Sequence, residues 1–154
     1  MKLDRIDCGL LEMLQQDARI SNKELARRSG ISASTCLERV RRLSEAGVLS
    51  GFHAEVAPRA LGIGVEAMIS VRHSQHQRLA LDTVRQQLLE MPAVTQVFLL
   101  AGTLDVLLHV TARDVDHLRQ VCEQITARRE VAHIETSLVF GHARSHVLPN
   151  YQPT

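Results

Sequence analysis

The run of residues 32–43 constrains this chain more than any other stretch. At 100° per residue, Cys36, Val40 and Leu43 fall on one stripe of a helix, and hydroxyl and charged side chains fall mostly on the other side. Ser32 is a suitable N-cap, and Gly47 is a suitable stop after the helix. Such a helix can rest on a small core and turn hydrogen-bonding side chains outward, as base readout in a DNA major groove requires.

The residues ahead of this helix predict a second, shorter one. Ser21 and Glu24 have the spacing of a capping box, the helix runs through Arg27 and Arg28, and Gly30 then turns the chain. Two short helices joined by a tight glycine turn are typical of a helix-turn-helix. A longer helix is expected before them, with an apolar face formed by Ile6, Leu10, Met13 and Leu14. From this pattern alone, an ordinary three-helix unit with a solvated basic face remains an equal alternative.

Four stretches of the chain resemble the leucine-responsive/asparagine-regulator family of bacterial transcription factors: residues 3–7, 21–25, 36–43 and 47–52. The similarity runs in order over nearly the whole chain, and it is closest in the recognition-helix run. The resemblance implies a winged helix-turn-helix, mapped from about Asn22 to Arg41, and it strongly favours DNA binding over the three-helix alternative.

The candidate DNA-binding residues follow from the helix wheel and this mapping. Those expected to face bases are Ser34, Thr35, Glu38 and Arg42, those expected nearer phosphates are Lys23, Arg39 and Arg41, and Asn22 and Ser32 complete the set. Glu38 has two equal interpretations. It either accepts a hydrogen bond from a cytosine amino group or orients Arg42.

Charge and composition limit the kinds of nucleic acid that the chain can bind. The 154 residues carry a net charge of +1. Residues 1–51 contain 9 Lys/Arg and 7 Asp/Glu. One copy therefore has little general attraction for phosphate, and useful affinity needs several copies on one double-stranded DNA. Aromatic residues make up only 3%, which argues against stacking platforms for single strands.

The same sequence features bear on compartment and cofactors. Cys8, Cys36 and Cys122 are scattered and form no disulfide framework. No signal-like apolar run follows Met1, and the longest apolar run, residues 97–101, cannot cross a bilayer, so we expect a cytoplasmic protein without membrane contact. No cofactor motif appears. His142 and His146 lie four residues apart, but in a strand or tail that spacing is too wide for one metal ion within one chain. Solvated or core histidines are the expected interpretation and no metal site is predicted, with a site across a dimer interface as the alternative.

The second half changes its periodicity. Residues 65–71 alternate as a half-buried strand, and residues 94–101 and 105–111 form two apolar strands around a turn at 102–104. Two amphipathic helices are marked by Leu81, Val84, Leu88 and Met91 and by Val115, Leu118, Cys122 and Ile125, and a last strand by Ile134, Thr136, Leu138 and Phe140. This order predicts a ferredoxin-like βαββαβ domain, and the whole chain is α+β. The open face of its sheet needs a cover, for which a second copy's sheet is the expected choice.

The expected organisation has four parts. A helix-turn-helix domain spans residues 1–51, a hinge with a short strand at 52–56 and a Pro/Gly-rich linker spans 52–64, a sensing and oligomerisation domain spans 65–142, and an extended tail spans 143–154. The resemblance implies dimers that assemble into octamers.

The resemblance also implies an amino-acid effector site at the turn between the two central strands, between dimers. Gly102 and Asp105 match the family's signature there, whereas Thr103, Leu104 and Val106 depart from it. Backbone N–H groups at a glycine suit a carboxylate, and Asp105 suits an α-ammonium. The candidate effector-binding residues are Ala101, Gly102, Thr103, Leu104 and Asp105, with Thr136 and Ser137 from a neighbouring subunit. Because of these departures, the chain binds either a different effector from that of its relatives or none. A further alternative is that Gly102 only permits a tight hairpin turn.

Two function classes therefore stand. The first is a sequence-specific DNA-binding transcriptional regulator whose assembly or DNA affinity responds to a small amino acid or a related metabolite. The second is an enzyme on the same architecture, similar to tetrapyrrole decarboxylases or small monooxygenases, in which a histidine such as His109 does the chemistry. The arginine-bearing helix favours the regulator, because an enzyme does not need it.

Overall fold

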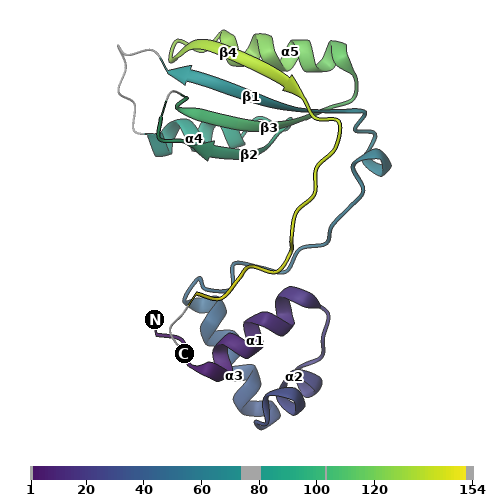
Figure 1. Cartoon of the computed structure of the whole chain (residues 1–154), viewed down its shortest axis with the longest axis vertical. Coiled ribbons are helices and arrows are strands. Elements are labelled where there is room, and N and C mark those ends of the chain that lie inside the picture. Colours follow the sequence, from purple (N-terminus) through teal and green to yellow (C-terminus); the bar gives the residue numbers. More distant parts are fainter. Residues whose placement is uncertain (1, 74–80, 103, 152–154) are drawn as a thin grey trace. The chain divides into compact units, whose positions relative to one another are not determined.

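A computed structural model of the chain describes residues 2–73, 81–102 and 104–151. Its contacts divide the chain into two units: residues 1–55 with 143–154, and residues 56–142. The first unit holds three helices, α1 (Arg5–Gln16), α2 (Asn22–Ser29) and α3 (Ala33–Glu45) (Figure 1). In its described residues, the second unit holds the sheet, two further α-helices and a short 3₁₀ helix.

The helix starts in the first unit are set by side-chain caps. The Ser21 hydroxyl accepts a hydrogen bond from the Glu24 N–H, and the Ser32 hydroxyl accepts one from the Thr35 N–H. Gly30 ends α2 in the left-handed conformation, at φ 65°, which costs glycine little. The helices close on a small apolar core made of Leu10, Leu14, Leu25, Ala26 and Cys36. The predicted helices and the predicted Ser32 cap are confirmed.

The strand predicted at residues 52–56 was wrong. These residues have no regular structure and are exposed, and a short 3₁₀ helix, η1 (Pro58–Leu61), follows them. A strand needs a neighbour for its backbone hydrogen bonds, and the backbone of residues 52–56 pairs with no strand of the described sheet. Alternating apolar residues alone do not supply that neighbour.

The second unit is the expected βαββαβ arrangement. Its elements are β1 (Val65–His73), α4 (Leu81–Leu89), β2 (Val94–Leu99), β3 (Val106–Ala112), α5 (Val115–Thr126) and β4 (Val131–Leu138). The strands form one antiparallel sheet in the order β2-β3-β1-β4, so β1 and β3 lie in the centre (Figure 1). The predicted ferredoxin-like topology is confirmed.

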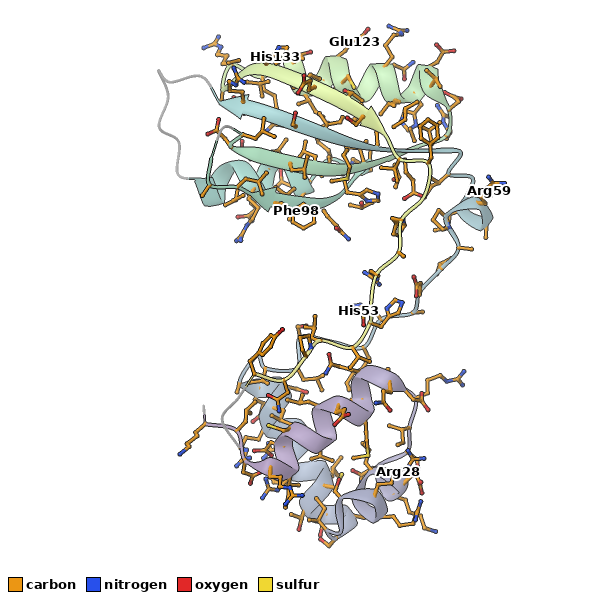
Figure 2. All side chains as sticks on the ribbon, in the orientation of Figure 1. Arg28, His53, Arg59, Phe98, Glu123 and His133 are labelled. Carbon is orange, nitrogen blue, oxygen red and sulfur yellow. The ribbon has the colours of Figure 1, made fainter. Side chains whose placement is uncertain are left out.

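One face of this sheet carries the core. On β3, Val106, Leu108, Val110 and Ala112 are buried while the residues between them are only half-buried. The buried residues pack with Leu88 of α4 and with Leu118, Val121 and Ile125 of α5. Both helices therefore cover the same face, and no helix of the described residues covers the opposite face, which carries Met68, Phe98 and Leu107. In Figure 2 the Phe98 ring projects outward from β2.

Two strand ends differ from the prediction. β2 stops at Leu99, because the Leu100 N–H donates to the Asp105 carbonyl and closes the turn. β4 starts earlier and stops at Leu138, and Phe140 lies beyond it, 98% exposed. The Val139 N–H still donates to the Glu66 carbonyl, but there the backbone of β1 begins and further pairing ends. Within the described ranges, the helices are too short or too polar to span a membrane.

Candidate nucleic-acid interface and ligand site

Helix α3 has the two faces that the sequence predicted. Cys36 and Leu43 are fully buried, and Val40 packs against the core of the first unit. Burial raises the pKa of the Cys36 thiol, which keeps this cysteine a neutral core residue. The exposed residues of the helix are Ala33, Ser34, Thr35, Leu37, Glu38, Arg41, Arg42, Ser44 and Glu45. Helix α3 thus offers a continuous outward surface of hydroxyl, acidic and basic groups around one leucine.

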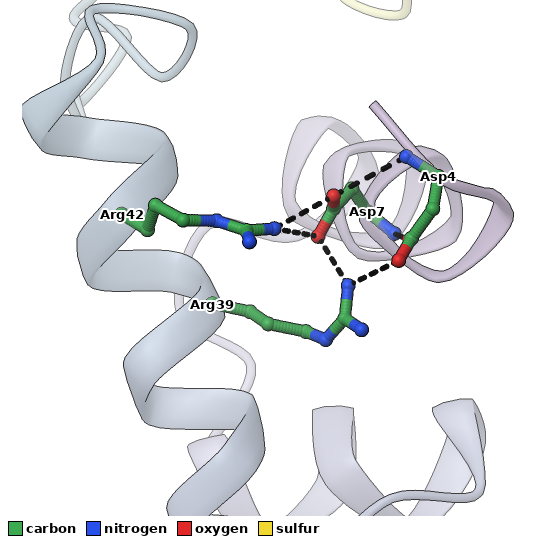
Figure 3. A network of polar contacts seen from close by, with 4 residues as sticks. All are labelled: Asp4, Asp7, Arg39 and Arg42. Atoms are coloured by element: carbon green, nitrogen blue, oxygen red, sulfur yellow. Dashed lines mark hydrogen bonds and ion pairs between the residues drawn. The ribbon is translucent and has the colours of Figure 1, made fainter. Parts of the chain in front are cut away.

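A buried carboxylate joins α1 to α3. Asp7 is only 1% exposed, and its carboxylate accepts hydrogen bonds from Arg39 Nη1 at 2.8 Å and from Arg42 Nη2 at 2.9 and 3.1 Å (Figure 3). Arg39 Nη1 also donates to Asp4 at 2.7 Å. Asp4 and Asp7 cap the start of α1 reciprocally. Two arginines of the recognition helix are therefore ion-paired within the domain.

This network changes the roles expected of two arginines. The wheel assigned Arg42 to bases and Arg39 to phosphates, but both guanidinium groups are turned toward Asp7 of α1. The carboxylates of Asp4 and Asp7 raise the pKa of Arg39. The sequence carried a signal for this arrangement that the wheel reading missed. Asp7 lies three residues before Leu10 and seven before Leu14, on the buried stripe of α1, where an acid needs a cationic partner.

Arg41 points to the outward side and is held there by carboxylates of its own helix. Its Nη2 lies 2.8 Å from Glu38 and its Nη1 lies 3.1 Å from Glu45. The Arg41 guanidinium, by a hydrogen bond and its charge, lowers the pKa of Glu38. Because all three side chains are about 60% exposed, the pairs are weak and can exchange partners. Arg41 is thus the arginine of α3 best placed to exchange a carboxylate for a phosphate.

The remaining DNA-binding candidates lie where α2 meets α3. Asn22 Nδ2 donates to the Ala33 carbonyl at 2.8 Å and so ties the two helix starts together. Lys23 is exposed. The hydroxyls of Ser34 and Thr35 lie 3.0 and 2.8 Å from the hydroxyl of Ser32. Ser32 thus caps α3 and Asn22 links the two helices, while Lys23, Ser34 and Thr35 lie on the surface.

The expected effector turn is a hairpin between β2 and β3. Gly102 adopts φ 140°, a region that side chains disfavour, although a Cβ at this position would point into open space. Ala101 is exposed, and Leu104 and Asp105 are partly buried, whereas Thr103 lies outside the described residues. The backbone conformation of this turn by itself favours a glycine at position 102.

Thr136 and Ser137 do not join this turn within one chain. They pair with Ile69 and Met68 on β1, and β1 separates β4 from the β2–β3 hairpin. The Thr136 hydroxyl lies 3.5 Å from the Cys122 sulfur of α5, which places it on the helix-covered side of the sheet. Contact between these residues and the turn requires a second chain, as the sequence reading proposed.

Sequence reasoning missed a polar cluster on the open face of the sheet. His109 Nδ1 lies 2.6 Å from the Thr95 hydroxyl, and His109 Nε2 lies 3.1 Å from the Glu66 carboxylate. The ring of His142 lies edge-on, with its centroid 6.2 Å from that of His109. His109, the residue that the enzyme hypothesis would use, is thus held by both of its ring nitrogens. Among the residues that the structure describes, no group of His, Cys, Asp and Glu is arranged to hold a metal ion.

Comparisons with known proteins match both halves of the chain. A family model for winged helix-turn-helix DNA-binding domains matches residues 3–50, and one for Lrp/AsnC ligand binding domains matches residues 66–147. The first range contains α1, α2 and α3, and the second runs from the second residue of β1 past the end of β4.

Relatives match nearly the whole chain. The regulator AldR of Mycolicibacterium smegmatis is 45% identical over 143 residues, covering 92% of this chain and 84% of AldR. The leucine-responsive regulatory protein of Rhizobium meliloti is 38% identical over 147 residues, covering 94% of this chain and 93% of that protein. A transcriptional regulator of Neisseria meningitidis, crystallised with L-methionine, superposes with a TM-score of 0.85 at 27% identity, covering 96% of this chain and 97% of that one. The match of both domains and this identity over nearly full length establish that the chain belongs to the Lrp/AsnC family of transcriptional regulators.

Proposed function

We propose that this protein regulates transcription by binding specific double-stranded DNA through α3, with the second unit coupling that binding to a small amino acid. The observation that carries the proposal is the outward face of α3, an exposed polar surface on a helix fixed to α1 by the Asp7 network. A rigid helix with outward donors and acceptors suits the major groove. A regulator of this kind works in the cytoplasm, where the DNA is.

We assign base and phosphate contacts on that face according to which side chains are already bound by other groups of the protein. We assign base contacts to Ser34, Thr35 and Glu38, and phosphate contacts to Lys23 and Arg41. Arg39 and Arg42 are assigned to holding α3 in place, with Arg42, half-exposed, adjacent to the groove. Asn22 and Ser32 set the geometry of the helix pair.

The experiment is an in vitro selection of duplexes from a random pool with the full-length protein, followed by footprinting. Enrichment of a defined sequence, with wild-type affinity falling steeply as salt rises, supports the proposal. Loss of that affinity in a Ser34→Ala/Glu38→Ala variant of unchanged melting temperature assigns it to α3. Enrichment of no sequence contradicts the proposal.

The effector half of the proposal rests on the β2–β3 turn. We assign the α-ammonium of an amino acid to Asp105 and its carboxylate to backbone N–H groups near Gly102, with Ala101, Thr103 and Leu104 shaping the pocket. Thr136 and Ser137 of a neighbouring subunit would close it. A thermal-shift screen of the twenty amino acids tests this site. An amino acid that raises the melting temperature of the wild type but not of Asp105→Ala supports it, and a screen without any shift makes the protein an effector-independent regulator.

Self-association completes the proposal. The helix-free face of the sheet carries Met68, Phe98 and Leu107, and Phe98 is 43% exposed. We propose that a second copy's sheet covers this face and that such dimers assemble further, toward octamers. Light scattering measures the mass directly. A monomer at micromolar concentration contradicts the proposal, and conversion of the assembly to monomer by Leu107→Glu supports this face as the contact.

A further inference from the structure

Leu37 is the one large apolar side chain that is exposed on α3, where the other exposed apolar residue is the small Ala33. It is 62% exposed and is not among the residues that pack against the core of the first unit. It is the fifth residue of the helix, one turn after Ser34 and one turn before Arg41, so these three side chains form a row. Leu37 therefore lies along the helix between two residues of the surface assigned to DNA.

The polar neighbours of Leu37 are engaged by other protein groups. Arg41 is held by Glu38 and Glu45, and the Ser34 hydroxyl lies 3.0 Å from that of Ser32. Leu37 has no polar atom and can take part only in apolar contact. In the major groove the apolar group that a base pair presents is the C5-methyl group of thymine.

We infer that Leu37 contacts the 5-methyl group of a thymine and so selects thymine at one position of each half-site. This inference rests on the proposed function, since it needs α3 in the major groove. The residue types on either side of Leu37 fit this assignment, because the hydroxyl and the guanidinium can fix the register while the leucine covers the methyl group. Covering one methyl group changes affinity about fourfold.

The test replaces thymine by uracil, which removes only the methyl group. A selected duplex is prepared with each thymine replaced in turn by deoxyuridine, and affinity is measured by fluorescence anisotropy at fixed salt. The wild type should lose about fourfold at one thymine per half-site. Leu37→Ala should bind the thymine and uracil forms equally there. Val48→Ala, which shortens an exposed apolar side chain of the same unit outside α3, should keep the wild-type ratio.

The outcomes separate the inference from the function on which it rests. A selected duplex whose affinity is the same with every thymine replaced overturns the methyl contact and leaves DNA binding intact. A thymine preference that Leu37→Ala retains in full also overturns it, because the methyl group is then read by another residue. Failure to select any duplex overturns the proposed function, and the inference with it. Because Leu37 is exposed, its variant should melt at the wild-type temperature.

Discussion

Asp7 of α1 accepts two hydrogen bonds from Nη2 of Arg42 on α3, at 2.9 and 3.1 Å, from a position 35 residues away in the sequence. Because Asp7 is only 1% exposed, its carboxylate has lost its contacts with water. Hydrogen bonds from Arg39 and Arg42 replace those contacts. The pairing fixes the rotation of α3 about its axis relative to α1. It thereby determines which side chains of α3 point outward.

Removing that carboxylate should loosen α3. Asp7→Ala leaves the Arg39 and Arg42 guanidinium groups without their buried partner. We expect a loss of about 1–3 kcal/mol in the free energy of opening of α1 and α3, since both arginines are partly solvated. Amide hydrogen exchange measures this for each helix separately. Glu12→Ala, at an exposed position of the same helix, is the control and should change the value by less than about 0.5 kcal/mol. An equal effect of the two substitutions would contradict the role of Asp7.

Arg39 and Arg41 should separate stability from DNA binding. Arg39→Ala breaks the contacts with Asp4 and Asp7 and should lower the melting temperature. Arg41→Ala removes only exposed pairs, so the melting temperature should stay unchanged. The slope of log affinity against log salt should then become shallower by about one unit in Arg41→Ala, because one phosphate contact is lost. The reverse pattern would assign the phosphate contact to Arg39.

Glu24 makes the stability of the first unit depend on pH. Hydrogen bonds from Arg27 and Arg28 lower its pKa to about 2, from an ordinary value of 4.5. A carboxyl group with a lowered pKa in the folded state stabilises the fold above its unfolded pKa and loses that contribution as the pH falls through the folded pKa. We therefore expect Glu24→Gln to melt below the wild type at pH 7, with the difference shrinking between about pH 4.5 and pH 2. A difference that is constant over this window would assign the effect to something other than titration of Glu24.

The core of the second unit should respond strongly to truncation. Ile69 on the central strand β1 is fully buried, and Ile69→Ala should cost about 2–5 kcal/mol, the range for deleting a large buried side chain. Val115→Ala on α5, where the side chain is 64% exposed, is the control and should be close to neutral. Chemical denaturation followed by circular dichroism compares the two. If Ile69→Ala lowered the free energy of unfolding as little as Val115→Ala does, neighbouring side chains would have moved in to fill the space left by Ile69.

The sequence predicts most of the fold because its signals are local. Ser32 caps α3, Gly30 ends α2, and the alternation along β1 and β3 identifies the buried face of the sheet. Each of these features depends on residues within a few positions of each other. The failures occur where a distant segment decides the outcome. The strand expected at residues 52–56 has no pairing partner, and β4 ends before Phe140 because β1 begins at Val65.

The site was harder to predict for the same reason. A helix wheel places Arg42 on the outward side of α3, but it contains no information about α1, and Asp7 of α1 binds that side chain. The wheel also gave no role to Leu37, which interrupts an otherwise polar surface. Arg41, Ser34 and Thr35, whose contacts are confined to their own helix and its cap, lie where the wheel put them.

The chain passes from the first unit to the second near residue 55 and returns near residue 143, so the sheet domain is in effect an insertion within the helical one. The returning residues are anchored, since the Leu148 N–H donates to Gln15 and His146 lies 3.0 Å from Glu55. A fragment cut at residue 55 would therefore be missing part of its own surface, and a circularly permuted chain would be the better way to isolate it. A helical unit held at two points also has less freedom to swivel than one on a single linker.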